Sequence, residues 1–258
     1  MKSRFVRRLD EAVVVALMSF AIGAGPMAAQ TPSANSDAEA RFNAGLTHLR
    51  DGRPKLALEE FQRAIKQDPK NPYFHKGLGL AYATLKRFDD AVGAFRKALE
   101  LNPYYTDVRN DLGMALVLAG KRQAGKAEFL AAFNDPTNPT PEISSRNLGQ
   151  AYFEEKNHAE AANWFRSSLN RNKDYPDAYL GLADALVALG RAEEATATLE
   201  TGASEAPAST GIQLALGEAY YRAGRFADAR ARLEDARKKD PTGADARRAA
   251  ELLKHFPK

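Results

Sequence analysis

The chain has 258 residues, of which 44% are hydrophobic and 27% charged, and it contains no cysteine. This composition is ordinary for a globular protein, and the missing thiols exclude disulfides, thiolate metal sites, a cysteine nucleophile and a lipid-modified cysteine. The formal net charge is +4, about half of it from the first thirty residues, so the rest of the chain is too weakly basic to predict nucleic acid as a partner.

Residues 1–30 have the pattern of a secretory signal peptide. A basic front is followed by an apolar run from Ala12 to Gly25 and then by the small residues of "GPMAAQ". The run is shorter than the roughly 20 residues that a membrane-spanning helix needs. We therefore expect cleavage after Ala29 or Gln30, a polar tether at 31–37, and a mature protein outside the cytoplasm without a membrane span. An uncleaved anchor is the alternative.

From residue 38 onward the sequence repeats itself. A glycine or alanine recurs in segments such as "LGLAY" and "LGEAY" at intervals of 34, 34, 36, 34 and 34 residues, with a small residue twelve positions later and a large apolar one sixteen positions later. Fixed spacing of this kind is typical of stacked helical hairpins. It predicts an all-α fold of six hairpins and a capping helix. The predicted units are 38–71, 72–105, 106–139, 142–175, 176–209 and 210–243, with the capping helix at 244–258.

Gly79 lies in the middle of a predicted first helix, where glycine costs about 1 kcal/mol relative to alanine. We interpret it as a point of close approach between the two helices of one hairpin, with Ala91 as a small residue on the second helix. Leu78, Tyr82 and Phe95 are expected to fill the surrounding space, and burying each contributes about 1.5–3 kcal/mol. The packing therefore outweighs the cost of the glycine.

The pattern L-G-x-x-Y…A-x-x-x-F…A…P resembles the tetratricopeptide repeat, and it covers most of the chain. The resemblance implies a right-handed superhelix of six tetratricopeptide-type hairpins plus a C-terminal capping helix. It also implies that the first helix of each hairpin lines a concave side that binds another protein.

In that family the second, fifth, ninth, twelfth and thirteenth residues of each unit point inward. Here the inward set is unusually apolar, which implies a groove for an apolar segment of a protein partner. Leu46, Leu80, Met114 and Leu118 should form one stripe of this groove, apart from the hairpin core. The alternative is that neighbouring repeats bury many of these residues. The predicted partner-binding residues are Phe42, Leu46, Leu49, Tyr73, Lys76, Leu80, Asn110, Met114, Val117, Leu118, Arg146, Gln150 and Phe153.

Between the third and fourth units, "FNDPTNPTPEISSRNLGQAYF" adds two residues and three prolines. This junction resembles that of the type IV pilus biogenesis proteins often called pilotins, exported six-repeat proteins that help the outer-membrane secretin assemble. The resemblance implies an exported, periplasmic, non-enzymatic adaptor with a secretin subunit as partner. A general envelope scaffold and an accessory subunit of an envelope enzyme are the alternatives. Because the family's lipid-modified cysteine is missing, no outer-membrane lipid anchor is expected.

Little in the sequence indicates catalysis or cofactor binding. "GKRQAGKA" (120–127) approaches the phosphate-loop pattern, but Ala127 stands where that pattern needs a hydroxyl, and no apolar strand precedes it. Gly120 and Gly125 fall instead at turn and close-contact positions of the third repeat. The histidines fall in different repeats, so we expect no metal site, and we expect no catalytic residue and no cofactor.

Overall fold

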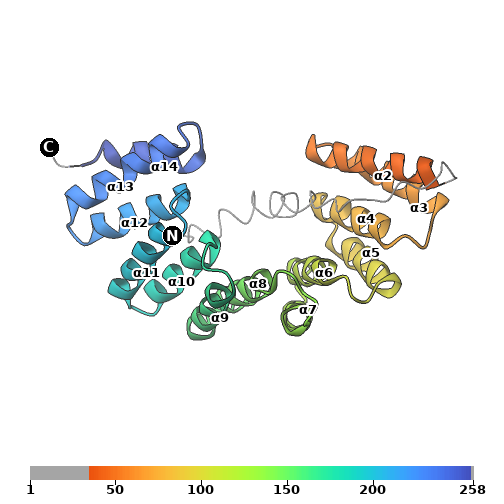
Figure 1. Ribbon diagram of the computed structural model, residues 1–258, viewed down its shortest axis with the longest axis horizontal. Helices are drawn as coiled ribbons and strands as arrows, with labels where there is room; N and C mark the ends of the chain where they lie inside the picture. The colour runs from red at the N-terminus through yellow and green to blue at the C-terminus, as the bar shows by residue number, and fades with distance from the viewer. Residues whose placement is uncertain (1–34, 257–258) are drawn as a thin grey trace. The chain divides into compact units, whose positions relative to one another are not determined.

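The structure, a computed structural model, describes residues 35–256, and every regular element among them is a helix (Figure 1). The all-α prediction is confirmed for this part of the chain. The predicted signal peptide and the start of the tether lie outside the described residues. The helices are α2 (Asn35–Arg50), α3 (Pro54–Gln67), α4 (Pro72–Thr84), α5 (Phe88–Leu101), α6 (Thr106–Leu118), α7 (Arg122–Asn134), α8 (Pro141–Glu154), α9 (His158–Arg171), α10 (Pro176–Ala188), α11 (Ala192–Glu205), α12 (Thr210–Arg222), α13 (Phe226–Lys239) and α14 (Ala244–Leu253).

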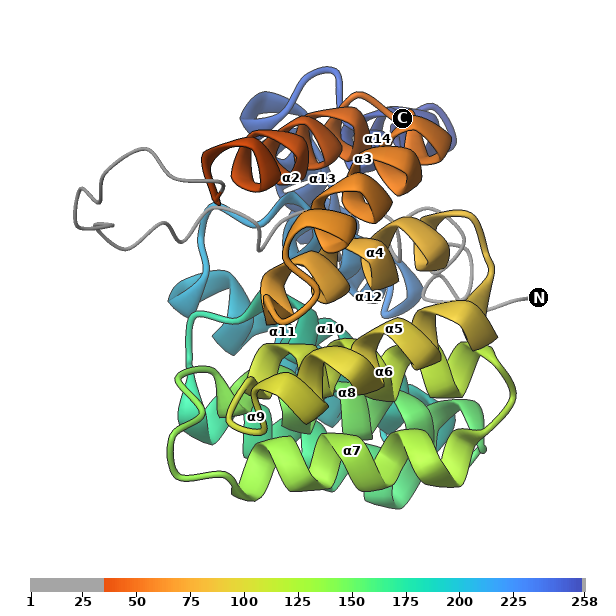
Figure 2. The ribbon, with the colours of Figure 1, turned by 90° about the vertical axis from the view of Figure 1, so that its right-hand side faces the viewer.

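The chain divides into two compact units between Pro139 and Thr140, inside the proline-rich junction. Unit 1 contains the hairpins α2/α3, α4/α5 and α6/α7, and Figure 2 shows them stacked in chain order. Unit 2 contains α8/α9, α10/α11 and α12/α13, followed by α14, which packs on α13 and α12. Among residues 35–256, no helix is both long enough and apolar enough to cross a membrane.

The turn inside each hairpin uses one residue with a positive φ. Four of these residues are glycines, for which the left-handed region carries no steric penalty. The other two are Lys86 and Lys156, with φ of 58° and 63°, and there the side chain makes the same turn less favourable. The spacing of the six positions follows the repeat seen in the sequence. The turn residues are Gly52, Lys86, Gly120, Lys156, Gly190 and Gly224.

In the core of unit 1, aromatic rings pack against glycines that lie within helices. A Cβ added to Gly79 would lie 2.5 Å from Cε1 of Phe95, and a Cβ added to Gly45 or Gly77 would lie 2.5 or 2.6 Å from Cε1 of Phe61. Phe61 therefore touches a glycine of its own hairpin and one of the next hairpin. The close approach expected at Gly79 is present, and its partner is the ring of Phe95, which is fully buried.

Unit 2 repeats this arrangement. Phe165 is fully buried, and a Cβ added to Gly149 or Gly181 would lie within 3 Å of its ring. At the C-terminal end, Leu214 and Leu233 form a cluster that α14 and Phe256 cover. The last helix thus buries apolar surface of the sixth hairpin, as a cap must do in a stacked repeat array.

The glycines of residues 120–127 serve the hairpin and not a phosphate loop. Gly120 makes the left-handed turn, with φ +80°. A Cβ on Gly125 would lie 2.6 Å from the carbonyl oxygen of Gly113 and 2.6 Å from Cγ2 of Val117, so α6 and α7 touch at this point. Helix α6 precedes the segment, where a phosphate loop would need a strand.

Candidate partner-binding surface

The predicted partner-binding residues of unit 1 lie on the first helices of its three hairpins. We call this surface the first-helix face. It consists of the following residues on α2, α4 and α6: Phe42, Leu46, Leu49, Tyr73, Lys76, Leu80, Asn110, Met114, Val117 and Leu118.

Part of this set is core and not free surface. Leu49 and Leu80 are 6% and 7% exposed and belong to the same buried cluster as Phe95. The expectation that Leu80 is separate from the hairpin core was wrong, because Leu80 is buried in the cluster that contains Phe61 and Phe95 of the second helices. Leu78 and Tyr82, assigned to that core, are only partly buried and pack against its edge.

Three more predicted groove residues are engaged in packing. The ring centroid of Phe42 lies 5.6 Å from that of Phe61 and 5.3 Å from that of Phe74, and Leu46 packs against the same cluster. Val117 contacts Gly125 on α7. These side chains help to join the helices of unit 1, and at most their edges are offered to a partner.

Met114, Leu118 and Tyr73 are the apolar residues of the first-helix face that remain accessible. Met114 and Leu118 are half-buried and lie outside the buried clusters of unit 1. Tyr73 is 53% exposed. An exposed aromatic ring on α4 and half-buried aliphatic side chains on α6 are the kinds of residue that can bind an apolar segment of a partner.

Charged and aromatic residues meet between α4 and α6. Nζ of Lys76 lies 2.6 Å from Oδ2 of Asp107 and 5.1 Å from the ring centroid of Tyr105. The ring of Tyr105 also meets that of Tyr73 edge-on, at 5.3 Å between centroids. Burial and nearby aspartates, including Asp111, raise the pKa of Tyr105. Sequence reasoning selected Lys76 and Tyr73 here but missed the other three residues.

Asn110 is 6% exposed, and its Oδ1 is buried without a hydrogen-bond donor among the described residues. A buried acceptor left unpaired costs about 1–3 kcal/mol. Asn110 lies between Asp107 and Asp111 on α6, so the same helical turn carries two carboxylates and one unsatisfied amide oxygen.

Asp111 sits in an environment that disfavours its charge. Desolvation raises the pKa of its carboxyl from 3.8 to about 7, although Lys76 acts in the opposite direction, and Asp107 raises it further. The residue as a whole still keeps some exposed surface.

This raised pKa predicts a pH dependence of stability. Because the folded pKa lies above the unfolded one, the group favours folding fully below about pH 4, and this contribution is lost as pH rises to 7 and above. Asp111→Asn should therefore be more stable than the wild type at pH 8, on the order of 1–3 kcal/mol, with a smaller difference at pH 5. Urea unfolding at both pH values measures this. Asp90→Asn, on exposed surface, is the control, and equal pH profiles for wild type and Asp111→Asn would contradict the assignment.

In unit 2 the predicted residues lie on α8. Nη2 of Arg146 lies 3.7 Å from Oδ2 of Asp177, and its Nε donates to the hydroxyl of Tyr175 at 3.4 Å. Gln150 donates from Nε2 to Glu154 within α8. These polar groups are thus bonded within the unit.

Phe153, the third predicted residue of α8, faces its own hairpin. Its ring meets that of His158 on α9, with 4.9 Å between centroids. The ring also packs against the buried cluster of unit 2. Phe153 is therefore a less accessible contact for a partner than Tyr73 of unit 1.

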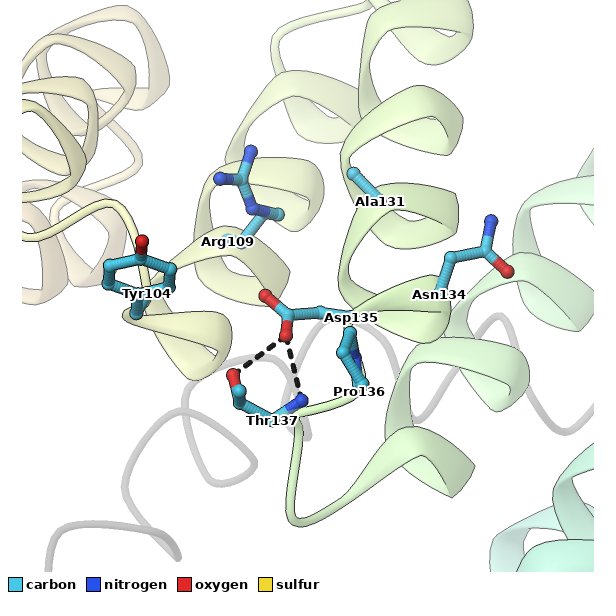
Figure 3. A pocket seen from close by; sticks show the side chains of 7 residues that line it. All are labelled: Tyr104, Arg109, Ala131, Asn134, Asp135, Pro136 and Thr137. Atoms are coloured by element: carbon cyan, nitrogen blue, oxygen red, sulfur yellow. Dashed lines mark hydrogen bonds between the residues drawn. The ribbon is translucent and has the colours of Figure 1, made fainter.

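An open hollow of about 440 Å³ lies beside the junction, between the α5–α6 loop and the end of α7 (Figure 3). Tyr104 and Arg109 form one side, and Asp135 and Thr137 the other. The side chain and backbone of Thr137 donate to Asp135 at 2.7 and 2.8 Å and lower the pKa of its carboxyl, while Arg109 donates to Glu128 at 3.1 Å. Arg109 and Asp135 are thus engaged with groups of the same unit, which disfavours a small-molecule site in this hollow.

Sequence comparison extends over both units. Two models described as tetratricopeptide repeat match the chain, one at residues 34–72, 42–106 and 110–176, the other at 152–210 and 201–254. The type IV pilus assembly protein PilF of Pseudomonas aeruginosa is 27% identical over 148 residues, which are 57% of this chain and 59% of that protein. The match thus spans less than two thirds of the relative.

Two solved structures share the fold. That of PilW, titled a widely conserved type IV pilus biogenesis factor, has a TM-score of 0.66 at 23% identity and covers 83% of this chain and 98% of its own. That of Pseudomonas aeruginosa PilF has a TM-score of 0.65 at 20% identity and covers 85% and 99%. With repeat models matching along both units and hairpins of the corresponding period, the chain belongs to the tetratricopeptide repeat family.

Proposed function

We propose that this chain is an exported, non-enzymatic adaptor that binds an apolar segment of another protein on the first-helix face of unit 1. We further propose that the partner is a subunit of the outer-membrane secretin and that the process is type IV pilus assembly. The similarity to PilF and PilW supports the pilus role. The basic and apolar pattern of residues 1–30 supports export to the periplasm.

The observation that carries the binding role is the accessible apolar surface of Tyr73, Met114 and Leu118. Tyr73 is about half exposed, and the other two side chains are half-buried outside the core clusters. Covering these side chains with a partner would remove further apolar area from water, at about 25 cal/mol per Å². Such a surface binds without any catalytic group.

The groove is tested with Met114→Glu combined with Leu118→Glu. We expect recovery of secretin subunits after crosslinking in the native host to fall at least tenfold, because an apolar partner segment would face unpaired charge. Helicity and melting temperature should change little, since both side chains are half-buried. Quantitative mass spectrometry of the crosslinked material measures the loss.

A matched control places the same charges elsewhere in unit 1. Leu56→Glu with Leu130→Glu alters two leucines that are each 42% exposed on second helices, and this variant should keep its partner. A substitution at Leu80 cannot serve, because that side chain is buried in the core cluster. Undiminished recovery with the Met114 and Leu118 double variant would reject the groove.

Export is tested separately. We expect the protein isolated from its native host to begin near Gln30 or Thr31, because the short apolar run between basic and small residues directs cleavage there. N-terminal sequencing measures this directly. Recovery of a chain that still begins with Met1 would contradict it.

A further inference from the structure

The contact between the second helix of one hairpin and the helix that follows it, here called a joint, changes at the C-terminal end of the stack. At the last joint, α14 packs on α13. Counting by the repeat, Ala250 of α14 stands where α4, α6, α8, α10 and α12 each have a leucine, and two of these leucines are buried in core clusters. Alanine is too short to occupy the same space. The leucines are Leu78, Leu112, Leu148, Leu182 and Leu216.

The second helix of the last joint departs from the repeat as well. Arg237 of α13 stands where the second helices of the five earlier hairpins carry an apolar side chain. At this position, Leu99 and Leu169 pack against the buried clusters of their units. At the last joint, therefore, a cation and an alanine replace an apolar residue and a leucine. The five apolar residues are Ile65, Leu99, Phe133, Leu169 and Ala203.

Both replacements line one hollow of about 680 Å³ between α13 and α14, here called the α13/α14 hollow. Its volume lies in the range of ligand-binding clefts, roughly 300–1,000 Å³. The side chains that matter for its chemistry are Glu234, Arg237 and Lys238 of α13 and Ala246, Arg247 and Ala250 of α14.

The cations that α13 contributes to this hollow are uncompensated. Arg237 and Lys238 are exposed, and neither has an ion pair among the residues that the structure describes, with Glu234 included. The next residue, Lys239, does pair with Asp235, at 2.6 Å. The hollow thus carries positive charge that its own helix does not neutralise.

The surrounding sequence strengthens this positive charge. Arg247 of α14 donates from Nη1 to the carbonyl oxygen of Thr242, a neutral group that leaves its charge in place. Residues 222–258 contain 11 lysines and arginines and 6 aspartates and glutamates, a net charge of +5, whereas residues 31–221 have a net charge of −3. An anionic partner is therefore attracted to this end of the chain.

We propose that the α13/α14 hollow binds an acidic segment of a protein, whose aspartate or glutamate side chains pair with Arg237, Lys238 and Arg247. Arginine recognises a carboxylate through two parallel hydrogen bonds, and lysine adds a point charge. Glu234 on the same wall disfavours a continuous polyanion such as nucleic acid, and a concave wall disfavours the flat surface of a lipid bilayer. The hollow belongs to unit 2, so this inference does not rest on the first-helix face.

The test selects random 12-residue peptides displayed on phage, against the full chain and against Arg237→Glu with Lys238→Glu. We expect acidic peptides with the wild type and none with the variant. One selected peptide is then synthesised with its acidic residues or with the matching amides, and fluorescence anisotropy measures both affinities. The amide peptide should bind the wild type at least about tenfold more weakly, because it loses hydrogen bonds between charged groups.

Ala250→Leu tests the hollow without a change of charge. The substitution restores the leucine found at the other joints and should fill the hollow, so that the melting temperature stays the same or rises. Affinity for the acidic peptide should fall about tenfold or more, because the filled space excludes its side chains. Unchanged affinity would show that the hollow is not the site and would overturn the proposal.

A matched control makes the same change of charge elsewhere. Lys55→Glu with Lys66→Glu alters two exposed lysines of α3 in unit 1, and it should still select the acidic peptides. Met114→Glu with Leu118→Glu should select them too, since the first-helix face is a separate surface. Circular dichroism should show unchanged helicity for Arg237→Glu with Lys238→Glu, so that lost selection cannot be attributed to unfolding.

The remaining outcomes each contradict the acidic segment. Selected peptides without acidic enrichment, or no selected peptide, would overturn it and leave the proposed function standing. An equal loss of acidic peptides with the Lys55 and Lys66 variant would assign the attraction to net charge alone. Vesicles of phosphatidylglycerol and a short DNA duplex are tested in parallel. If either binds the wild type but not the Arg237 and Lys238 variant, while no acidic peptide is selected, the partner is a lipid surface or a nucleic acid instead.

Discussion

Replacing Phe95 with alanine is expected to lower the free energy of unfolding by about 3–5 kcal/mol, the usual cost of removing a fully buried ring. Phe95 is 0% exposed, and its ring fills the space that Gly79 leaves open. Because the glycine has no side chain with which to close the gap, the cavity should persist. Urea denaturation followed by circular dichroism measures the change.

The matched control for this variant is Leu130→Ala, at a leucine that is 42% exposed in the same unit. It should change the free energy of unfolding by no more than about 0.5 kcal/mol. A loss of less than about 1 kcal/mol for Phe95→Ala would mean that the ring does not fill the space beside Gly79.

Truncation after Gly243 should be the second severe change. It removes α14 and Phe256 and uncovers Leu214 and Leu233, which are 4% and 0% exposed in the intact chain. Returning parts of two leucines to water costs roughly 2–4 kcal/mol, and the new apolar end should associate with other copies. Thermal melting and size-exclusion chromatography measure the two effects.

The truncated chain should keep the helices of unit 1, because hairpins in a stacked array contact mainly their neighbours. Amide hydrogen exchange in α2–α7 should therefore match that of the intact protein. Removal of residues 257–258 alone is the control and should alter neither melting nor size. An unchanged melting temperature and monomer size after truncation at Gly243 would contradict the capping role of α14.

The hairpin architecture was predictable because it depends on residues at fixed intervals. A glycine sixteen positions before an aromatic residue, as with Gly79 and Phe95, specifies a contact inside one hairpin. The left-handed turns follow the same interval, although Lys86 and Lys156 occupy two of them and would not have been chosen on conformational preference alone.

The candidate site was less predictable, because repeat position gives the direction of a side chain but not how deeply a neighbouring helix covers it. Leu80 and Met114 occupy the same place in their units, yet Leu80 is buried with the core and Met114 is half-buried. The pairing of Lys76 with Asp107 crosses from one hairpin to the next at a separation of 31 residues. Comparing residues 31 positions apart along the sequence could have found this ion pair.

Other local contacts leave no pattern in the sequence. Ser168 stands where the repeat usually has alanine. Its hydroxyl is fully buried and donates to the carbonyl oxygen of Glu142 at 2.8 Å, joining α9 to the start of α8. A small side chain was required by the repeat spacing, and the hydrogen bond follows from backbone geometry that only the folded hairpin supplies.

The rings of Phe61 and Phe165, each held between glycines of two successive hairpins, restrict how such a chain can change length during evolution. Gaining or losing a few residues inside a helix would move one glycine away from the shared ring and leave a clash or a void. Duplication or deletion of a whole 34-residue block restores both contacts at once. The two extra residues of this chain lie instead in the loop after α7, near the boundary between the two units, where neither of these rings has to keep its register.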